Sequence, residues 1–220
     1  MWFFFRRRIL FFYKTFPFKP RLKIGYLLFY KAGLAFVEKL INDGYEIFLD
    51  LKLCDTPSTI SNVADLLKNL KIKWVTIHPW TGFDSVNIIH TRLKNCATVL
   101  VPFLTTINDQ EYKKIWHQEK LSLIDFSIDL LDLNRLSCHA VICSIQESKT
   151  IKKKFPKIIT ICPGGMISDQ NKKFLHARNA SLTSAYKKEK VDYLVVGRTI
   201  INSDNPLQMY KKIYDQFNQE

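Results

Sequence analysis

The sequence predicts an α/β fold built on one parallel β-sheet. Short apolar stretches alternate with longer stretches of helical periodicity, which is typical of parallel strands joined by crossover helices. The stretch over 47–53 is apolar almost throughout, as expected of a strand that is covered on both faces. Seven strands are expected. A closed (β/α)8 barrel has eight.

Length and composition suit a single folded domain. The chain has 220 residues, of which 47% are hydrophobic and 24% charged, and this composition excludes a disordered protein. A net charge of +13 raises the question of an anionic partner such as nucleic acid or a membrane surface. The lysines are scattered apart from clusters at 152–154 and 187–188, and no nucleic-acid-binding motif accompanies them. We therefore predict no nucleic-acid partner.

Residues 1–20 form an atypical aromatic and basic segment, and residues 21–220 are expected to form one barrel domain. The aromatic and arginine-rich run over 1–13 is too short and too interrupted to span a bilayer. It also lacks the order of a signal peptide, in which charge precedes the apolar run. A membrane-surface segment and a displaced start of the coding sequence remain open, and no membrane span is predicted.

The first elements follow from periodicity and from turn residues. A short strand over 21–25 precedes a helix over about 29–43, which Gly44 is expected to end as a C-terminal cap. The apolar strand over 47–53 comes next. Pro57 then opens a helix, since proline is tolerated in the first turn.

The second half continues the alternation of strands and helices. Further strands are expected over 74–78, 97–103, 140–143, 157–161 and 192–196. Further helices are expected over about 108–136, 146–154 and 179–189, and from about 205 to the end. No internal repeat or second-domain linker interrupts this order.

Charged residues at the end of the strand over 47–53 are the main functional signal. Asp50 and Lys52 are two residues apart, so on a strand their side chains share a face, and Asp55 follows just past the strand end. Burying such charges is costly unless they pair, and a structural ion pair is one interpretation. Catalytic residues of α/β barrels lie at the carboxyl ends of strands, so the D-x-K-x-x-D spacing before Thr56-Pro57-Ser58-Thr59 favours an active site.

Two loops after the last two expected strands predict a phosphate site. Pro163-Gly164-Gly165 follows the strand over 157–161, and Gly197-Arg198 follows the strand over 192–196. Backbone N–H groups, a helix N-terminus and a guanidinium group together suit a phosphate dianion. In (β/α)8 barrels, the loops after strands seven and eight often bind phosphate. Ordinary turn glycines are the alternative interpretation.

The stretch Phe48-Leu49-Asp50-Leu51-Lys52-x-x-Asp55-x-Pro57-x-Thr59 resembles the signature of the orotidine 5'-phosphate decarboxylase family. The resemblance covers roughly residues 21–210. It implies a (β/α)8 TIM barrel that acts as a cytoplasmic homodimer with shared active sites. It also implies conversion of orotidine 5'-monophosphate to UMP and CO2 in de novo pyrimidine biosynthesis, without a metal or organic cofactor.

The resemblance implies catalytic roles for a lysine–aspartate network. Lys23, in Leu22-Lys23-Ile24-Gly25, matches the family's lysine in the strand before the signature. Asp50 would sit against the substrate carboxylate, and Lys52 would stabilise charge at C6 and protonate that carbon. Lys23 and Asp55 would hold the charges in place. Asp55 and Thr59 are expected to reach into the neighbouring subunit's site.

Substrate-binding residues follow from the same resemblance. Thr106 stands where the family usually has a serine that binds the pyrimidine, and Gln170 of Asp169-Gln170 is expected near the phosphate. The phosphate itself is expected at Pro163, Gly164, Gly165, Gly197 and Arg198. The chain departs from the family at Pro-Gly-Gly-Met over 163–166, where Pro-Gly-Ile-Arg is usual, and at Gly-Arg-Thr-Ile over 197–200, where Gly-Arg-Pro-Ile is usual.

The start of the chain differs from the family pattern more strongly. The family begins with a strand carrying Leu-Asp, whose aspartate holds the ribose, a little over twenty residues before the lysine that Lys23 matches. Counting back from Lys23 runs off the start of the sequence. We therefore expect the first strand to be missing or replaced and that aspartate to be absent. Exposed sheet edges would then lower solubility and activity.

Two alternatives remain at the level of sequence. A sugar-phosphate decarboxylase or hexulose-phosphate synthase of the same superfamily shares D-x-K-x-x-D but uses magnesium, and a degenerate barrel would be dimeric but inactive. The Asp55–Thr59 stretch and Asp169-Gln170 favour the pyrimidine enzyme. No metal site is predicted at His78, and the cysteines lack zinc-ligand spacing. Reduced thiols in a cytosolic enzyme are expected at Cys54, Cys96, Cys138, Cys143 and Cys162.

Overall fold

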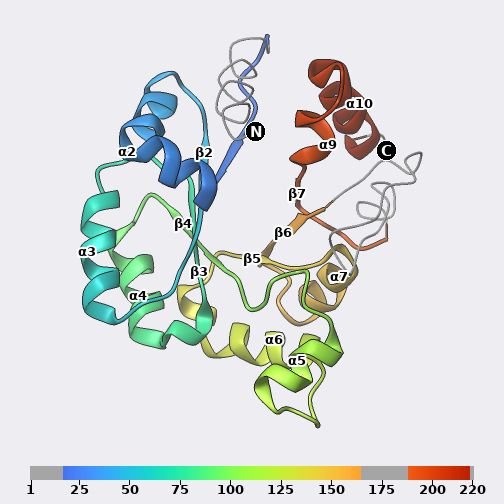
Figure 1. Ribbon diagram of the computed structural model, residues 1–220. Coiled ribbons are helices and arrows are strands. Elements are labelled where there is room, and N and C mark those ends of the chain that lie inside the picture. The colour runs from blue at the N-terminus through green and yellow to red at the C-terminus, as the bar shows by residue number, and fades with distance from the viewer. Residues whose placement is uncertain (1–16, 165–187, 219–220) are drawn as a thin grey trace.

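A computed structural model describes residues 17–164 and 188–218, and it shows a curved parallel sheet with helices around its outer side (Figure 1). Seven strands pair in the order of the chain, and every neighbouring pair is parallel. The strands are β1 (Leu22–Gly25), β2 (Ile47–Leu53), β3 (Trp74–Ile77), β4 (Ala97–Leu100), β5 (Ala140–Ile142), β6 (Ile159–Pro163) and β7 (Tyr193–Val195). The predicted α/β barrel class is confirmed.

Helices connect the strands and cover the outer face of the sheet (Figure 1). The α-helices are α2 (Tyr26–Asn42), α3 (Pro57–Leu67), α4 (Phe83–Arg92), α5 (Asp109–Trp116), α6 (Leu123–Leu133), α7 (Ile145–Lys154), α9 (Arg198–Ile201) and α10 (Pro206–Asn218). Short 3-10 turns are η1 (Pro79–Thr81) and η2 (Arg135–Ser137). Within 17–164 and 188–218, no helix is long and apolar enough to cross a membrane.

The helices differ in detail from the sequence prediction. The helix expected over 108–136 is two helices, because His117 adopts a left-handed conformation with φ 49° and ends α5. Helix α2 begins earlier than expected, and Gly33, with φ 73°, interrupts its helical path. Helix α4 is an element that the sequence analysis does not identify. The helix expected over 179–189 lies almost entirely outside the described residues.

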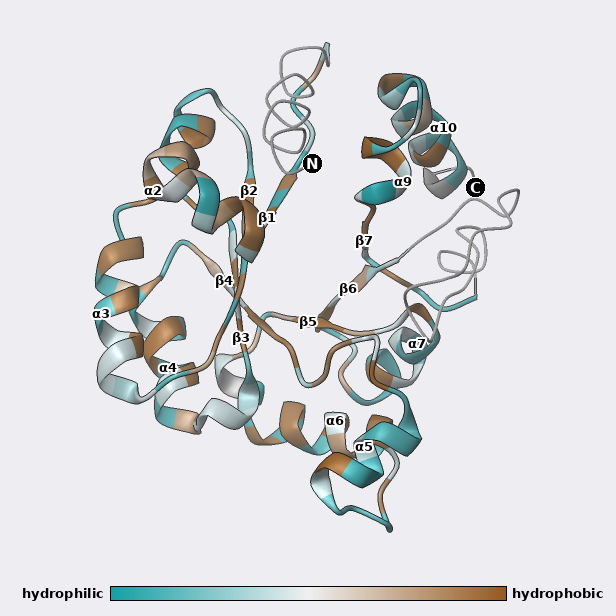
Figure 2. Cartoon of the chain, viewed as in Figure 1, coloured by the Kyte–Doolittle hydropathy of each residue, from teal (hydrophilic) through white to brown (hydrophobic). Residues whose placement is uncertain are grey.

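Strand side chains divide between an inner and an outer core. One apolar cluster gathers alternate strand residues on the barrel interior: Phe48, Val99, Val101, Ala140, Ile142 and Ile161. The intervening residues, such as Leu49 and Val75, join a larger cluster with the buried faces of α2 and α3. Figure 2 shows hydrophobic residues along β4 to β6 and a mixture of hydrophobic and hydrophilic residues along the helices. Because successive strand residues alternate in direction, Asp50 and Lys52 share the inner face with Phe48.

A row of aromatic rings crosses the interior from β2 to β7. The Trp74 ring meets Phe48 edge-on at 5.5 Å between centroids and Tyr193 at 4.6 Å. On the far side of this row, the Arg21 guanidinium lies 5.3 Å from the centre of the Tyr193 ring. The chain just before β1 therefore contacts β7, the strand at the opposite edge of the described sheet.

Candidate active site

The carboxylate of Asp50 lies between two lysine ammonium groups. Lys23 Nζ donates to Asp50 Oδ2 at 2.7 Å, and Lys52 Nζ donates to Asp50 Oδ1 at 2.8 Å. The hydroxyl of Thr76 donates to the same Oδ1 at 3.1 Å. The structure thus brings together Lys23, Asp50 and Lys52, which are three of the four residues predicted to be catalytic.

Strand register explains this convergence. Parallel pairing of β1 with β2 sets Lys23 opposite Phe48 and Gly25 opposite Asp50, and β3 lies on the other side of β2. Asp50 is 4% exposed, whereas the side chains of Lys23 and Lys52 are 30% and 24% exposed. The anion is therefore buried at the base of the cluster, and the two cations face its open side.

The charge of Asp50 depends on its partners. Burial opposes ionisation of this carboxyl, but the charges and hydrogen bonds of Lys23 and Lys52 outweigh that effect and hold its pKa below the usual value. Asp50 is consequently a carboxylate at neutral pH. An isolated buried carboxylate would be strongly destabilising, so the two lysines are needed for the fold as well as for any chemistry.

The backbone of Lys52 is strained. Its φ of 46° is left-handed, a conformation that costs a residue with a Cβ atom about 1–2 kcal/mol. The strain coincides with an irregular register between β2 and β3, between Leu49 and Leu53. Two side chains hold this peptide: Thr76 Oγ1 accepts from Lys52 N–H at 2.7 Å, and the Tyr26 hydroxyl donates to the Lys52 carbonyl at 3.2 Å. Such strain often accompanies functional sites.

Thr76 and His78 occupy the neighbouring strand end, and sequence reasoning gave them no part in the lysine cluster. Thr76 is a polar residue within the apolar strand β3, which is the sequence signal that marks it, and His78 directly follows that strand. His78 Nδ1 lies 2.7 Å from the Val101 carbonyl, and its ring packs 4.3 Å from that of Trp80. Burial lowers the pKa of His78, and the nearby Lys52 charge lowers it further, so this imidazole is neutral at pH 7.

Asp55 and Thr59 do not join the lysine cluster within the single chain. Asp55 Oδ1 accepts from Thr56 N–H at 2.7 Å, and Asp55 is exposed. Thr59 is exposed on α3, with its hydroxyl 3.2 Å from that of Thr56. In the part of the chain that the structure describes, no ion pair links the Asp55 carboxylate to a lysine or arginine.

The two predicted phosphate loops end neighbouring strands. Pro163 pairs with Val195, and Gly164 N–H donates to the Val195 carbonyl at 3.3 Å. The φ of 97° at Gly164 is one that glycine adopts readily. Arg198 is the first residue of α9, Gly197 directly precedes it, and both are exposed.

The remaining residues predicted to bind substrate are Thr106, Gly165 and Gln170. Thr106 is exposed after β4, while the preceding Thr105 is buried. Gly165 and Gln170 lie outside the described residues. Their part in the predicted site therefore stays a prediction.

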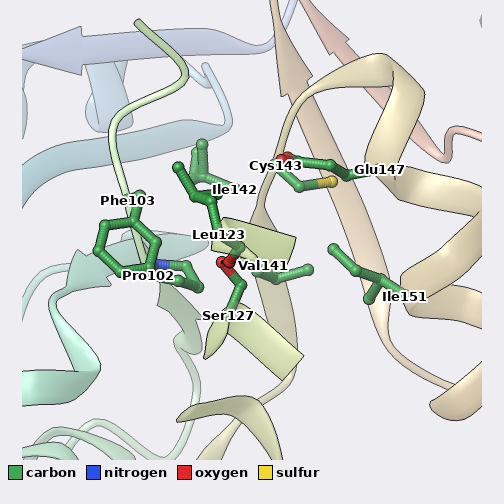
Figure 3. A pocket seen from close by; sticks show the side chains of 9 residues that line it. All are labelled: Pro102, Phe103, Leu123, Ser127, Val141, Ile142, Cys143, Glu147 and Ile151. Atoms are coloured by element: carbon green, nitrogen blue, oxygen red, sulfur yellow. Dashed lines mark hydrogen bonds between the residues drawn. The ribbon is translucent and has the colours of Figure 1, made fainter. Parts of the chain in front are cut away.

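A separate small pocket lies on the helical side of β5, between α6 and α7 (Figure 3). Its lining includes Phe103, Ser127, Cys143 and Glu147. None of the residues predicted to be catalytic or to bind substrate lines this pocket. The lysine cluster, and not this pocket, is therefore the candidate active site.

The chain is similar to known proteins over most of its length. The family model described as "Orotidine 5'-phosphate decarboxylase / HUMPS family" matches residues 15–213. An orotidine 5'-phosphate decarboxylase of Nautilia profundicola is 32% identical over 206 residues, covering 89% of this chain and 85% of that protein. The corresponding enzyme of Campylobacter concisus is 31% identical over 211 residues, covering 89% and 87%.

A solved structure extends the likeness to three dimensions. The crystal structure of orotidine 5'-phosphate decarboxylase from Lactobacillus acidophilus superposes with a TM-score of 0.76 at 28% identity, and the match covers 89% of this chain and 86% of that one. The relatives named here are all carboxy-lyases, which supports the main prediction over the sugar-phosphate alternative. The chain therefore belongs to the orotidine 5'-phosphate decarboxylase / HUMPS family, as the Asp50–Lys52–Asp55 signature predicts.

Proposed function

We propose that this chain decarboxylates orotidine 5'-monophosphate to UMP and CO2 in de novo pyrimidine biosynthesis. The observation that carries the proposal is the arrangement of Lys23 and Lys52 around the buried Asp50, in a chain of this family. The two ammonium groups supply positive charge on the open side of the cluster, where a substrate anion would bind.

The chemistry assigned to the cluster is a proton transfer coupled to carbon–carbon bond cleavage. The bond between C6 and the substrate carboxylate breaks, CO2 leaves, and the electron pair stays at C6. Lys52 stabilises this negative charge and donates its Nζ proton to C6, giving UMP, and the neutral amine regains a proton from water. Preorganised charges of this kind are worth about 3–4 kcal/mol each in transition-state stabilisation.

Asp50 has two roles in this proposal. Its carboxylate fixes the ammonium of Lys52 at 2.8 Å, and it lies against the carboxylate of the bound substrate. Lys23 and Thr76 hold Asp50 in turn, so the cluster needs little reorganisation during the reaction. Stabilisation of the developing carbanion, rather than repulsion between the two carboxylates, is taken as the main contribution.

The substrate phosphate is assigned to the loops after β6 and β7. Arg198 is the proposed guanidinium partner, with Gly197, Pro163 and Gly164 beside it and Gly165 and Gln170 completing the site. The adjacency of Pro163 and Val195 supports a single site formed by both loops. Thr106 is proposed to contact the pyrimidine.

Replacing Arg198 by alanine is expected to weaken UMP binding by at least tenfold. The phosphate would lose a charged hydrogen-bond partner, and such bonds contribute about 1.5–3 kcal/mol. Calorimetric titration with UMP measures the change, with Arg92→Ala as the matched control because Arg92 pairs with Asp65 on the protein surface. An unchanged dissociation constant for Arg198→Ala would remove this residue from the site.

We further propose a cytoplasmic homodimer in which Asp55 and Thr59 complete the site of the partner subunit. Both residues are exposed at the rim and are not joined to the lysine cluster of their own chain. Exposed apolar side chains on the nearby α3, η1 and α4 provide a surface for association: Leu66, Trp80 and Phe83. All five cysteines are thiols, which supports a reducing compartment.

Incubation of the purified chain with orotidine 5'-monophosphate in EDTA tests the proposed function. We expect UMP to form in equal amount to the substrate consumed, as measured by chromatography. Magnesium-dependent sugar-phosphate substrates, supplied in parallel with magnesium, are expected to remain unchanged. Conversion of a sugar phosphate in magnesium, with no UMP formed in either condition, would replace the proposal by the sugar-phosphate alternative.

A further inference from the structure

Tyr26 contacts Lys52 at two points. Its hydroxyl donates to the Lys52 carbonyl oxygen at 3.2 Å, and Lys52 Nζ lies 6.0 Å from the centre of its ring. Tyr26 is the first residue of α2, directly after β1, the strand that carries Lys23. It is 42% exposed, so it stands at the rim of the cluster rather than in the core.

The hydroxyl contact falls on the strained peptide of the site. Lys52 has φ 46°, a conformation disfavoured for a residue with a Cβ atom. Thr76, from β3, accepts from its N–H, and Tyr26, from α2, donates to its carbonyl. Since the rotamers open to a side chain depend on backbone φ and ψ, this peptide conformation sets the direction from which Lys52 reaches Asp50.

The ring contact acts on the other end of the same residue. An ammonium group within about 6 Å of an aromatic centroid is attracted by the face of the ring. Tyr30 stacks on the Tyr26 ring, with 5.8 Å between centroids and 9° between planes, and this contact orients the ring. Burial raises the pKa of the Tyr26 phenol, as do the charges of Tyr30 and Asp50, so the hydroxyl remains a donor at neutral pH.

We propose that Tyr26 is a positioning residue that holds the backbone and the ammonium of Lys52 in the geometry needed for protonation of C6. The inference rests on the proposed decarboxylation. Because Tyr26 contacts Lys52, the proposed proton donor, its loss is expected to lower kcat and to leave substrate affinity unchanged.

Two substitutions separate the two contacts. Tyr26→Phe removes the hydroxyl and keeps the ring, and it is expected to lower kcat about fivefold, the usual effect of one hydrogen bond. Tyr26→Leu removes both contacts and is expected to lower kcat by about a hundredfold, since small misplacements of reacting groups have effects of that size. For both variants, we expect KM and the dissociation constant of UMP to stay within about twofold.

Tyr214→Phe is the matched control, because Tyr214 is an exposed tyrosine on α10 whose ring also stacks on a second tyrosine, Tyr210. Its kcat is expected to equal that of the wild type. A kcat within twofold of wild type for Tyr26→Leu would overturn the proposal. So would a fall in kcat matched by a lower melting temperature and a weaker affinity for UMP, because these would indicate a structural role.

A crystal structure of Tyr26→Leu tests the inference without any activity. The proposal predicts that Lys52 leaves the left-handed region and that its Nζ moves away from Asp50. An unchanged φ at Lys52, with Nζ still at hydrogen-bond distance from Asp50, would contradict it. If the wild-type chain formed no UMP, the proposed function would fail, and this structure would still decide whether Tyr26 positions Lys52.

Discussion

Replacing Lys52 by alanine is expected to lower kcat at least a thousandfold, while UMP still binds through the loops after β6 and β7. The variant loses both the proton donor and one of the two cations beside Asp50. Proton donors contribute about 10²–10⁴-fold, and loss of a preorganised charge adds to that effect. Steady-state kinetics measure the loss, and calorimetry with UMP shows whether the substrate pocket is intact.

Lys68→Ala is the matched control for this experiment. Lys68 also forms an ion pair, with Asp65 at 3.2 Å, but this pair is exposed at the C-terminal end of α3. Its replacement should leave kcat unchanged, because exposed pairs contribute little. If Lys52→Ala retained more than a tenth of wild-type activity, a barrier change below about 1.4 kcal/mol, Lys52 would not be the proton donor.

Asp55→Ala is expected to be as inactive as Lys52→Ala when each is assayed alone, and a mixture of the two chains should regain activity. In a mixed dimer, one site combines Lys52 of the first chain with Asp55 of the second, and that site is intact. With random exchange, about a quarter of wild-type activity should return, because half of the dimers are mixed and each has one working site. The exposed position of Asp55 motivates this experiment.

Native mass spectrometry establishes that mixed dimers have formed before the assay. Asp65→Ala serves as a control, since Asp65 is also an exposed carboxylate but pairs with Lys68 and Arg92 on its own chain. Mixed dimers without activity, or full activity of Asp55→Ala alone, would argue against the shared site.

The sequence predicted the strand framework well, because buried parallel strands leave a clear apolar pattern. All seven expected strands appear, and the two-residue spacing of Asp50 and Lys52 places both on the inner face. Lys23 is different. By pattern alone it resembled a solvated strand-end lysine, and only the family resemblance assigned it to the site, where it pairs with Asp50.

Two helix-capping patterns in the sequence mark the starts of α5 and α6 as separate helices. Asn108 and Glu111 form a capping box at the start of α5, and Ser122 caps α6 through Asp125 N–H. Both are short-range patterns that mark helix starts. The loop between the two helices, residues 117–122, contains no proline or glycine that would mark a break, so the segment resembled one long helix.

The contacts that set the backbone geometry of Lys52 could not be predicted from the sequence. Its left-handed φ is unexpected for lysine, and it depends on side chains from two other elements, Thr76 and Tyr26. Those contacts join residues about 25 positions apart in the chain, so no local pattern reveals them. Tertiary structure, rather than propensity, fixes this part of the site.

The most direct test of the central claim is the rate at which the purified wild-type chain releases labelled CO2 from carboxyl-labelled orotidine 5'-monophosphate in EDTA. We expect the wild type to release CO2 in equal amount to UMP, and we expect this release to fall to near background in Lys52→Ala at a substrate concentration that saturates both proteins. No release by the wild type, or equal release by both proteins, would contradict the assignment of the Lys23–Asp50–Lys52 cluster as a decarboxylase active site.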